Sequence, residues 1–479
     1  MKRAESKATA VWRIFEGIAQ VPRPSGGERA VGEWIAGLAR ERGLAARFDA
    51  AGNLLVEAPA SAGRQDRPGV ILQGHLDMVC QKRPESGHDF AKDPIRLVER
   101  EGWIYGDGTT LGADNGVGVA MALAAATEPG VAHPRLELLF TVDEETGLTG
   151  ATALRPDFLR GRRLLNLDSE DDSFTVGCAG GEQTQIDLPV KSGPVGERKA
   201  YRLAVGGLRG GHSGVNIHEQ RANALKLLGR CLAGLADAGD LRIGTIAGGS
   251  AHNAIPRDAE ATIWLKDKRA GAAKILAKLE GIFRDEYAEV EPEIKVELTA
   301  VKNASKTALT AAGTQTVVDL LLAMPNGVHR FSRQFEGIVE TSSNLAMAAT
   351  EKGQVTLVSS QRSLKESCLD AMTAAVTAVA NLAGTKTTTL GRYPGWDPDP
   401  NSALLAECVR AYEGLRGRRP AICVIHAGLE CGIIGKTYPG MDMASLGPNI
   451  ENAHSPQERV EIASVDACWE LLTALLGRL

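Results

Sequence analysis

Between residues 70 and 168, three short apolar runs each lead directly into histidine or acidic residues. The run at 70–72 precedes His75, the run at 136–142 precedes three consecutive acids, and the apolar residues 165 and 167 precede Asp168. Runs rich in Val, Leu and Ile that are bounded by Gly, Pro or charge are typical of buried strands. Because sites in α/β proteins form at strand ends, the pattern predicts a polar site at one rim of a sheet.

Apolar spacing predicts helices before and between these strands. Two amphipathic patterns occupy residues 8–44, on either side of a Pro-x-Pro-Ser-Gly-Gly break at 22–27. Residues 114–126 are small and apolar, which indicates a closely packed helix. Strands that alternate with helices imply an α/β sandwich with a mostly parallel or mixed sheet.

Length and a change of pattern predict two domains. A chain of 479 residues is too long for one hydrophobic core. Residues 186–395 combine strand-like alternation with two long helical patterns, at 222–238 and 366–382, which fits an inserted α+β domain. We therefore expect one α/β domain formed by residues 1–185 and 396–479, split by an insert at 186–395.

Composition argues against several classes of function. A net charge of -5 and an aromatic content of 4% give no basic surface and no stacking platform for nucleic acid. Charges interrupt any N-terminal secretory signal, and no stretch approaches the roughly 18 apolar residues of a membrane span. The eight cysteines show no C-x-x-C spacing, which suits free thiols in a reducing compartment. We expect a cytoplasmic protein without nucleic-acid or membrane partners.

The first candidate site is Gly74-His75-Leu76-Asp77. A neutral His75 imidazole can bind a metal through one ring nitrogen, while Asp77, two residues on, holds the other nitrogen and fixes the tautomer. On these residues alone, a histidine with a purely structural role is the alternative.

The second candidate is Asp114, which ends a loop rich in Gly and Thr at residues 106–116. At the start of the expected helix its side chain can act as an N-cap. It can also bridge two cations, with the glycines allowing the backbone to approach closely. Both interpretations stay open at this point.

The third candidate is the acidic run at Asp143, Glu144 and Glu145. Consecutive charges at the end of a buried strand repel one another unless cations or protons neutralise them. Glu144 and Glu145 can divide the roles of general base and metal ligand. A solvated charge run is the alternative.

Two further segments complete a metal-binding inventory. Asp168 follows an apolar pair, and His454 lies in Asn-Ala-His-Ser-Pro near the C-terminus. Together the segments supply two histidines and three carboxylates besides the base, which suffices for two cations that share one acid.

The motifs resemble those of the co-catalytic zinc metallopeptidases, and among them the family of bacterial aminoacyl-histidine dipeptidases, also called cytosol non-specific or beta-alanyl-histidine dipeptidases. The likeness covers nearly the whole chain. It rests on GHLDMVCQK (74–82), DGTTLGADNGVGVA (107–120), DEETGLTGA (143–151), NLDSED (166–171), GGHSGVNIH (210–218), HNAIPR (252–257), YPGW (393–396), HAGLECG (426–432) and NAHSPQERV (452–460). The resemblance implies a zinc-aminopeptidase-like catalytic domain, with a mixed sheet flanked by helices, and a lid or dimerisation domain at 186–395.

The resemblance also implies a role for each site residue. Two zinc ions are expected per subunit, although cobalt or manganese can occupy similar ligand sets. The expected ligands are His75 and Asp168 for one zinc, Glu145 and His454 for the other, and Asp114 as the bridge; Asp77 orients His75, and Glu144 is the general base for a water between the metals.

Substrate contacts are expected from both domains. His212 resembles the family histidine that stabilises the oxyanion once the lid closes, with a turn histidine as the alternative. Asn253 resembles a companion contact. Arg362 is the candidate for the substrate's terminal carboxylate, with a surface arginine as the alternative. Glu430, an acid among small residues, is expected to bind the free amino group.

The expected activity is hydrolysis of unblocked dipeptides, including Xaa-His peptides such as beta-alanyl-histidine. The alternative on the same scaffold is an aminoacylase, a deacetylase or a tripeptidase. A non-catalytic binding protein has no use for the base Glu144, and a cysteine hydrolase lacks a Cys/His nucleophile context. The resemblance also suggests a homodimer.

Overall fold

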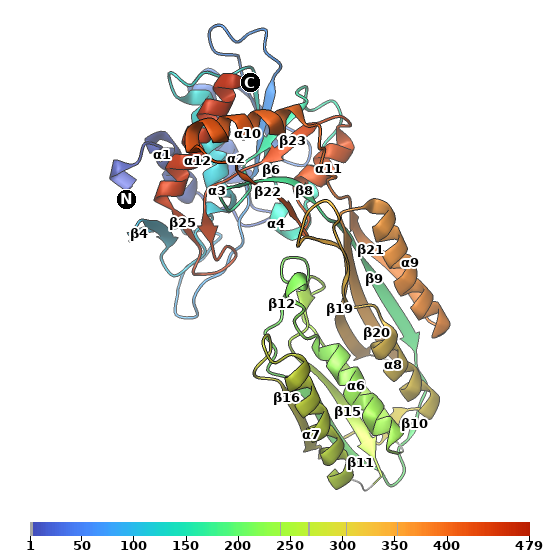
Figure 1. Ribbon diagram of the computed structural model, residues 1–479. Helices are drawn as coiled ribbons and strands as arrows, with labels where there is room; N and C mark the ends of the chain where they lie inside the picture. The colour runs from blue at the N-terminus through green and yellow to red at the C-terminus, as the bar shows by residue number, and fades with distance from the viewer. Residues whose placement is uncertain (1–2, 240, 267–268, 303, 352) are drawn as a thin grey trace. The chain divides into compact units, whose positions relative to one another are not determined.

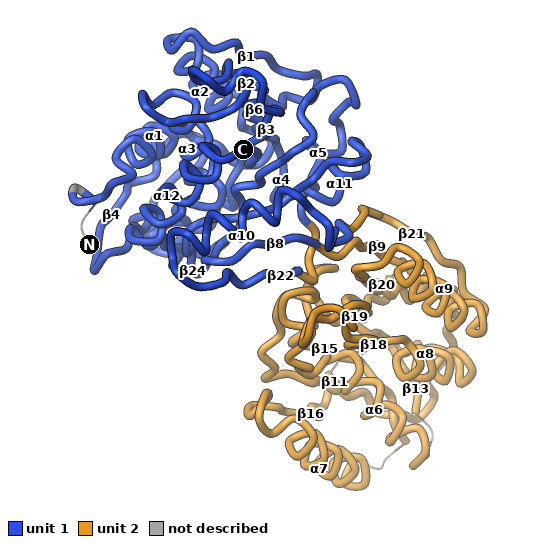
Figure 2. Tube along the Cα trace, turned by 45° about the horizontal axis from the view of Figure 1, so that its top comes forward, with its two compact units in different colours: residues 1–177, 396–424, 429–479 blue, residues 178–395, 425–428 orange. Residues whose placement is uncertain are grey.

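A computed structural model describes residues 3–239, 241–266, 269–302, 304–351 and 353–479. The chain forms two compact units, drawn in blue and orange in Figure 2. The first unit contains residues 1–177, 396–424 and 429–479, and the second contains 178–395 and 425–428. The sequence placed the insert at 186–395; the second unit also takes in 178–185 and 425–428. None of the helices in the described part of the chain has the length and apolar character that a bilayer crossing needs.

The first unit is built on a mixed eight-stranded sheet (Figure 1). Its centre is parallel, because β6, β3, β7 and β23 run side by side in one direction, whereas β1 and β2 add antiparallel strands at one edge. The mixed sheet of the α/β prediction is therefore confirmed. In sheet order the strands are β1 (Ala45–Phe48), β2 (Leu54–Ala58), β6 (Leu136–Thr141), β3 (Val70–His75), β7 (Arg163–Asn166), β23 (Asp442–Ser445), β8 (Ser173–Cys178) and β22 (Ala421–Ile425).

Strand β3 shows why the apolar runs predicted strands. All six of its residues are buried, and it pairs on both sides with parallel neighbours. A strand buried on both faces gains from continuous apolar residues rather than from alternation. The apolar residues of β3 stand in its first half, and its polar residues, Gln73 and His75, stand in its second half.

Helices cover this sheet and place loops at its rim. Helix α3 packs on β3 and on α1, α2 contacts β1 and β2, and α10 packs on β23 and on α12. The helices predicted at 8–44 and 114–126 are thus present. The bounds are α1 (Thr9–Ala19), α2 (Arg29–Glu41), α3 (Ala113–Thr127), α4 (Glu144–Gly147), α5 (Thr149–Thr152), α10 (Ala403–Arg416), α11 (Glu430–Thr437) and α12 (Ile462–Arg478). A small sheet joins β24 (Ile450–Glu451), β25 (Arg459–Glu461), β5 (Trp103–Gly106) and β4 (Leu97–Arg100).

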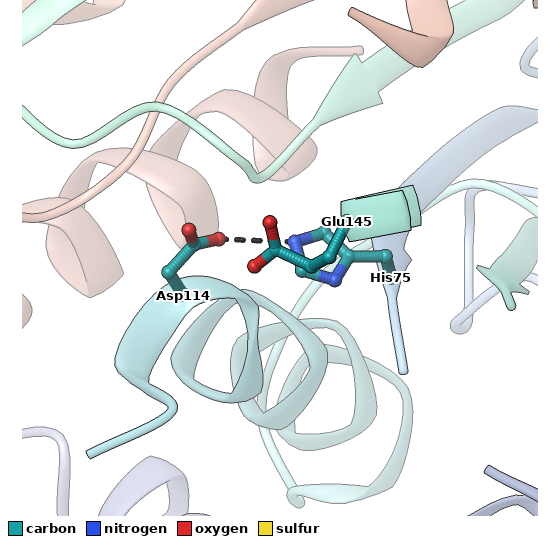
Figure 3. Close-up of side chains that lie close together, drawn as sticks. All are labelled: His75, Asp114 and Glu145. Atoms are coloured by element: carbon teal, nitrogen blue, oxygen red, sulfur yellow. Dashed lines mark hydrogen bonds and ion pairs between the residues drawn. The ribbon is translucent and has the colours of Figure 1, made fainter. Parts of the chain in front are cut away.

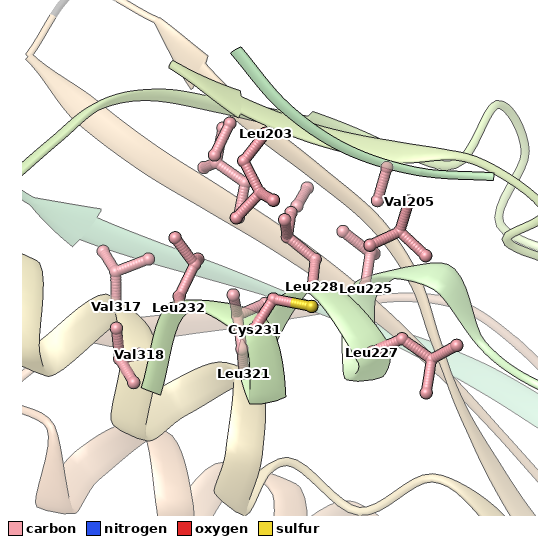
Figure 4. Packing of buried hydrophobic residues seen from close by; sticks show 14 of the residues in the cluster. Leu203, Val205, Leu225, Leu227, Leu228, Cys231, Leu232, Val317, Val318 and Leu321 are labelled. Atoms are coloured by element: carbon pink, nitrogen blue, oxygen red, sulfur yellow. The ribbon is translucent and has the colours of Figure 1, made fainter. Parts of the chain in front are cut away.

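The second unit is a nine-stranded sheet with helices packed on it. Its core joins inward-facing strand residues such as Leu203 and Val205 to Leu228 and Leu232 of α6 and Leu321 of α8 (Figure 4). The sheet follows the order β16 (Lys295–Ala300), β11 (Lys199–Gly206), β15 (Ala259–Leu265), β13 (Arg242–Gly248), β19 (Val339–Glu351), β20 (Gln354–Ser363), β9 (Gly180–Pro189) and β21 (Lys386–Tyr393), with β18 (Gly327–Phe331) paired to β19.

Two helices of this unit were not predicted, because the sequence analysis expected only the long helices at 222–238 and 366–382. Besides α6 (Ala224–Asp237) and α9 (Glu366–Leu382), the unit contains α7 (Arg269–Glu286) and α8 (Ala311–Ala323). In α7 the only buried side chains are Ala272, Leu276 and Phe283. So narrow an apolar stripe on an otherwise polar helix is a weak periodic signal. The two predicted helices, α6 and α9, are present, and the weak signal of α7 explains why that helix was not predicted.

Candidate metal centre

The predicted site residues of the first unit come from neighbouring strand ends. Strand β3 ends at His75, β6 ends two residues before Asp143, and β7 ends two residues before Asp168. Because β6, β3 and β7 are adjacent and parallel, these ends lie at one rim of the sheet. Asp77 lies beyond the end of β3 rather than within it.

Asp114 lies between the two histidines, at the start of α3. Its Oδ1 is 3.0 Å from Nε2 of His75, and its Oδ2 is 3.0 Å from Nε2 of His454. One carboxylate thus turns a different oxygen toward each imidazole. Figure 3 shows Asp114, His75 and Glu145 converging from three elements.

A second carboxylate accompanies each histidine. Oδ1 of Asp168 is 3.3 Å from Nε2 of His75, and Oε2 of Glu145 is 3.1 Å from Nε2 of His454. His75 is 1% exposed at its side chain, whereas His454 is 52% exposed. His454 adopts a φ of 64°, an unusual backbone conformation for a residue with a side chain. The structure therefore brings the five residues together as two histidine–carboxylate pairs that share Asp114.

This donor set fits divalent cations. Oε1 of Glu145 is buried and accepts no hydrogen bond within the described chain, and Oδ1 of Asp168 is approached by Nε2 of His75 at 3.3 Å. Ligand atoms of His75, Asp114 and Glu145 lie within 4.8 Å of one another. Nitrogen and carboxylate oxygen are ligands that zinc accepts. Buried anionic oxygens without donors are costly unless a cation neutralises them.

The pKa values of the two histidines also favour a cation at this site. Burial alone would lower the pKa of His75, but Asp168 and Asp114 raise it well above its usual value. Hydrogen bonds that the protonated His454 donates to Asp114 and Glu145 raise the pKa of His454 to about 11. Without a cation, protons on the imidazoles would offset the charge of the carboxylates, and a bound cation would displace those protons.

Asp77 supports both His75 and the acidic run. Its Oδ1 is 3.3 Å from Nδ1 of His75, and its carboxylate accepts the backbone N–H groups of Glu144 and Glu145 at 3.1 Å each. The Ser25 hydroxyl donates a further bond of 2.8 Å. Burial alone would raise the pKa of Asp77, but His75 and the hydrogen bonds lower it to about 2. A permanently ionised Asp77 can hold His75 in the tautomer that presents Nε2.

The three consecutive acids have different surroundings. Glu145 faces His454, whereas the Asp143 carboxylate accepts hydroxyl bonds from Thr146 and Thr149 and stabilises its own turn. Glu144, the first residue of α4, is half-buried. Burial, opposed in part by His75, raises the pKa of Glu144 well above its usual value.

The second unit contains a compact cationic group around Arg362. Arg362 is 6% exposed, and its Nη1 donates to the Tyr393 hydroxyl at 2.7 Å. Nδ1 of His212 accepts the backbone N–H groups of Val215 (3.0 Å) and Gly214 (3.3 Å), so the ring proton of a neutral His212 lies on Nε2. That nitrogen is 3.5 Å from Nη2 of Arg362. The guanidinium of Arg362 is a fixed cation in this group and suits an anionic acceptor.

Asn253 and Glu430 occupy contrasting positions. Asn253 is exposed and, with His212, lines a cavity of about 940 Å³ in the second unit. Glu430, the first residue of α11, is 1% exposed and accepts bonds from Gln73 (2.6 Å) and Thr141 (2.7 Å). Burial raises the pKa of Glu430 to about 7. Binding of a substrate amine by Glu430 stays a prediction.

Two buried residues of the first unit, Arg23 and Glu458, had no predicted role, and neither had the partly buried Tyr393 of the second unit. Arg23 and Glu458 both bind the loop that carries Asp114, and Tyr393 holds Arg362. Arg23 stands between two prolines, and the other two lie inside motifs that the sequence analysis quoted. For Glu458 and Tyr393 the available signal was a polar residue inside a quoted motif, but the residues that they contact are distant in sequence.

Comparisons with known proteins identify the family of the chain. The chain is 43% identical over 470 residues to the cytosol non-specific dipeptidase of Escherichia coli (strain K12), covering 97% of this chain and 96% of the relative. It is 39% identical to the crystal structure of the aminoacylhistidine dipeptidase from Vibrio alginolyticus, with a TM-score of 0.87 and coverage of 100% and 98%.

A more distant structure shares the fold alone. The tripeptidase from Staphylococcus aureus is 17% identical, with a TM-score of 0.57 and coverage of 99% of this chain and 98% of its own. The family model of Peptidase family M20/M25/M40 matches residues 71–478. With this match and 43% identity along nearly the whole chain, the protein belongs to peptidase family M20/M25/M40.

Proposed function

We propose that the protein is a dinuclear zinc dipeptidase. The observation that carries the proposal is Asp114, which turns one carboxylate oxygen toward His75 and the other toward His454, at 3.0 Å each. Each histidine has one further carboxylate beside it. Two cations that share one acid require this ligand arrangement.

The five side chains divide into two ligand sets. His75 and Asp168 would hold one zinc ion, Glu145 and His454 the other, and Asp114 both. Bound zinc would supply Lewis acidity for the scissile carbonyl and a lowered pKa for water. Asp77 keeps His75 in the ligating tautomer.

Glu144 is the proton carrier of the proposed reaction. It takes a proton from the attacking water and delivers that proton to the leaving amine, so that one side chain acts first as base and then as acid. Burial, which raises the pKa of Glu144, brings the carboxylate closer to the proton affinity that this double role needs.

Residues of the second unit would recognise the substrate. His212 presents an N–H at Nε2, which suits stabilisation of a developing oxyanion. Arg362 is held by Tyr393 and can bind a terminal carboxylate through its guanidinium. Asn253 is exposed on the same cavity as His212 and is proposed as a further contact.

The relatives support short free peptides as substrates. The two relatives reported above at 43% and 39% identity over nearly the whole chain are a cytosol non-specific dipeptidase and an aminoacylhistidine dipeptidase. We therefore propose unblocked dipeptides, Xaa-His and beta-alanyl-histidine among them, as substrates of this chain. A cytoplasmic location and a homodimer complete the proposal.

The decisive experiment removes the proposed base and leaves the ligands. Glu144→Gln keeps the size of the side chain but removes its basicity, and we expect turnover of a dipeptide to fall by about 10²–10⁴-fold. Two zinc ions per chain should remain bound, measured by metal analysis. Glu85→Ala, which changes an exposed glutamate, serves as the control with full turnover. Unchanged turnover in the Glu144→Gln protein would refute the mechanism.

The substrate class is tested separately. Free dipeptides, N-acetyl amino acids and tripeptides are compared by kcat/KM on the zinc-loaded protein. We expect the free dipeptides to be hydrolysed best. A preference for N-acetyl amino acids would identify an aminoacylase or deacetylase, and a preference for tripeptides a tripeptidase.

A further inference from the structure

Glu458 binds the loop that carries Asp114. Its Oε2 accepts the backbone N–H groups of Leu111 (2.8 Å) and Gly112 (3.0 Å), and its Oε1 accepts those of Ala113 (2.8 Å) and Asp114 (3.4 Å). The glutamate is 2% exposed. One buried carboxylate thus satisfies the N–H groups that no carbonyl within α3 can reach, and its charge favours the helix N-terminus.

The same glutamate is tied to His454. The backbone N–H of Glu458 donates to the Ser455 carbonyl at 3.0 Å, which closes a tight turn directly after His454. Glu458 therefore links the segment that presents one proposed ligand to the loop that presents another.

Arg23 binds this loop by a different backbone group. Its Nη2 donates to the carbonyl of Gly112, while its Nη1 donates to the carbonyls of Leu76 (2.8 Å) and Asp77 (2.7 Å). Arg23 is 4% exposed, and its flanking prolines restrict the backbone around it. A bridge between Pro24 and Met78 fixes this segment beside the end of β3. The arginine thus joins the loop of Asp114 to the segment of His75.

The loop sequence fits the guanidinium closely. A Cβ added at Gly116 would lie 2.7 Å from Nη2 of Arg23 and 2.9 Å from Phe15, which real side chains do not tolerate. Gly112 has a φ of 69°, in the left-handed region that favours glycine. The glycines around Asp114 therefore allow backbone and arginine to meet.

We propose that Arg23 and Glu458 are positioning residues that clamp Gly112 by its carbonyl and its N–H and thereby fix the carboxylate shared by the two cations. The inference rests on the proposed function for the role of Asp114. Because the two oxygens of Asp114 face different histidines, a shift of the loop disturbs both cation sites together. Removal of either clamp residue should therefore weaken both sites by similar factors.

The test measures zinc affinity without substrate. Full-length protein is stripped of metal, and zinc is titrated in competition with a chromophoric chelator. Glu458→Gln places an amide N–H₂ among backbone donors, and Arg23→Lys removes the fork that reaches two loops. For each variant we expect both zinc ions to bind about 10–100-fold more weakly.

A matched control separates positioning from general destabilisation. Glu137 is 1% exposed and accepts the backbone N–H groups of Arg160 and Gly161 at 3.0 Å, with an arginine beside it, at the start of β6. Glu137→Gln should lower the urea midpoint as Glu458→Gln does, but it should leave zinc affinity at the wild-type value.

Each outcome decides the proposal. If a folded Glu458→Gln or Arg23→Lys protein binds zinc with wild-type affinity, that residue is not part of the clamp. If Glu137→Gln weakens zinc binding as much as the clamp variants do, the proposal is wrong. If one clamp variant fails to fold, the other decides; if neither folds while Glu137→Gln does, the two residues are structural and the proposal is rejected. Tight zinc binding without peptide hydrolysis would contradict the proposed function and leave the clamp standing.

Discussion

His426 shows how the interior of the second unit controls one side chain. It is 8% exposed, and its Nε2 is 2.7 Å from the Ser342 hydroxyl. Burial, with Arg362 nearby, lowers the pKa of His426 to about 3. A neutral histidine beside Arg362 adds no charge where the proposed function places a substrate carboxylate.

This buried histidine predicts acid sensitivity with a definite sign. An unfolded histidine titrates near pH 6.5, so the folded protein resists protonation of His426 between pH 6.5 and 3. The stabilisation is complete above pH 6.5 and declines as the pH falls through that window. Because of this difference in pKa, the free energy of unfolding should fall by about 2 kcal/mol between pH 7 and pH 5. The free energy of unfolding is measured in urea at pH 7 and at pH 5. Between these pH values it should fall by about 2 kcal/mol less in His426→Gln than in wild type.

The control for this prediction is another histidine of the same unit. His218 is exposed, and His218→Gln should keep the wild-type dependence of stability on pH. If His426→Gln and wild type lose equal stability between pH 7 and pH 5, the assignment of the acid sensitivity to His426 is wrong.

Helix α3 positions Asp114 by being made of small residues. Its buried face packs on β3 and α1, and glycines occur where other segments approach. A Cβ added at Gly118 would clash with the carbonyl of Leu167, one residue before Asp168. The closeness of α3 to the end of β7 therefore sets the separation of two proposed ligands.

Gly118→Ala should separate these elements. We expect a loss of about 1–3 kcal/mol in the free energy of unfolding, because the added methyl overpacks the contact. Dipeptide turnover and zinc content should also fall. Gly37 lies within α2 with open space around its Cβ, so Gly37→Ala should instead stabilise the protein by about 0.4–1 kcal/mol. Equal effects of the two substitutions would contradict the packing argument.

At the scale of the whole molecule, the proposed ligands all belong to one unit. Every proposed zinc ligand lies in the first unit, whereas the cluster around α6 and α8 gives the second unit a core of its own. A cation that binds only the folded site stabilises the elements that form this site, because binding shifts the equilibrium toward the folded state. Cation removal should therefore affect the two units unequally.

Hydrogen exchange measured by mass spectrometry tests this difference. Removal of divalent cations with a chelator should speed exchange in peptides covering residues 111–116, 143–147 and 452–458. Peptides from α6 and α8 should exchange at unchanged rates and serve as the internal control. Equal acceleration in both units, or none in the first, would contradict the proposed cation site.

Elements whose signal is local could be predicted from the order of the residues. Buried parallel strands need continuous apolar residues, so β3 and β6 could be predicted together with the acids at their ends. Helix α7 could not be predicted in this way, because its apolar stripe is narrow and its few buried side chains are buried by contacts with distant parts of the chain.

Which acids lie beside which histidine depends on how the chain folds. Glu145 faces His454 across about three hundred residues of sequence, while its neighbour Asp143 binds threonines of its own turn. The positions of Arg23 and Glu458 likewise depend on distant backbone groups. The sequence shows the chemistry of each side chain. Which groups a charged side chain contacts depends on the strand ends and loops that the fold brings together.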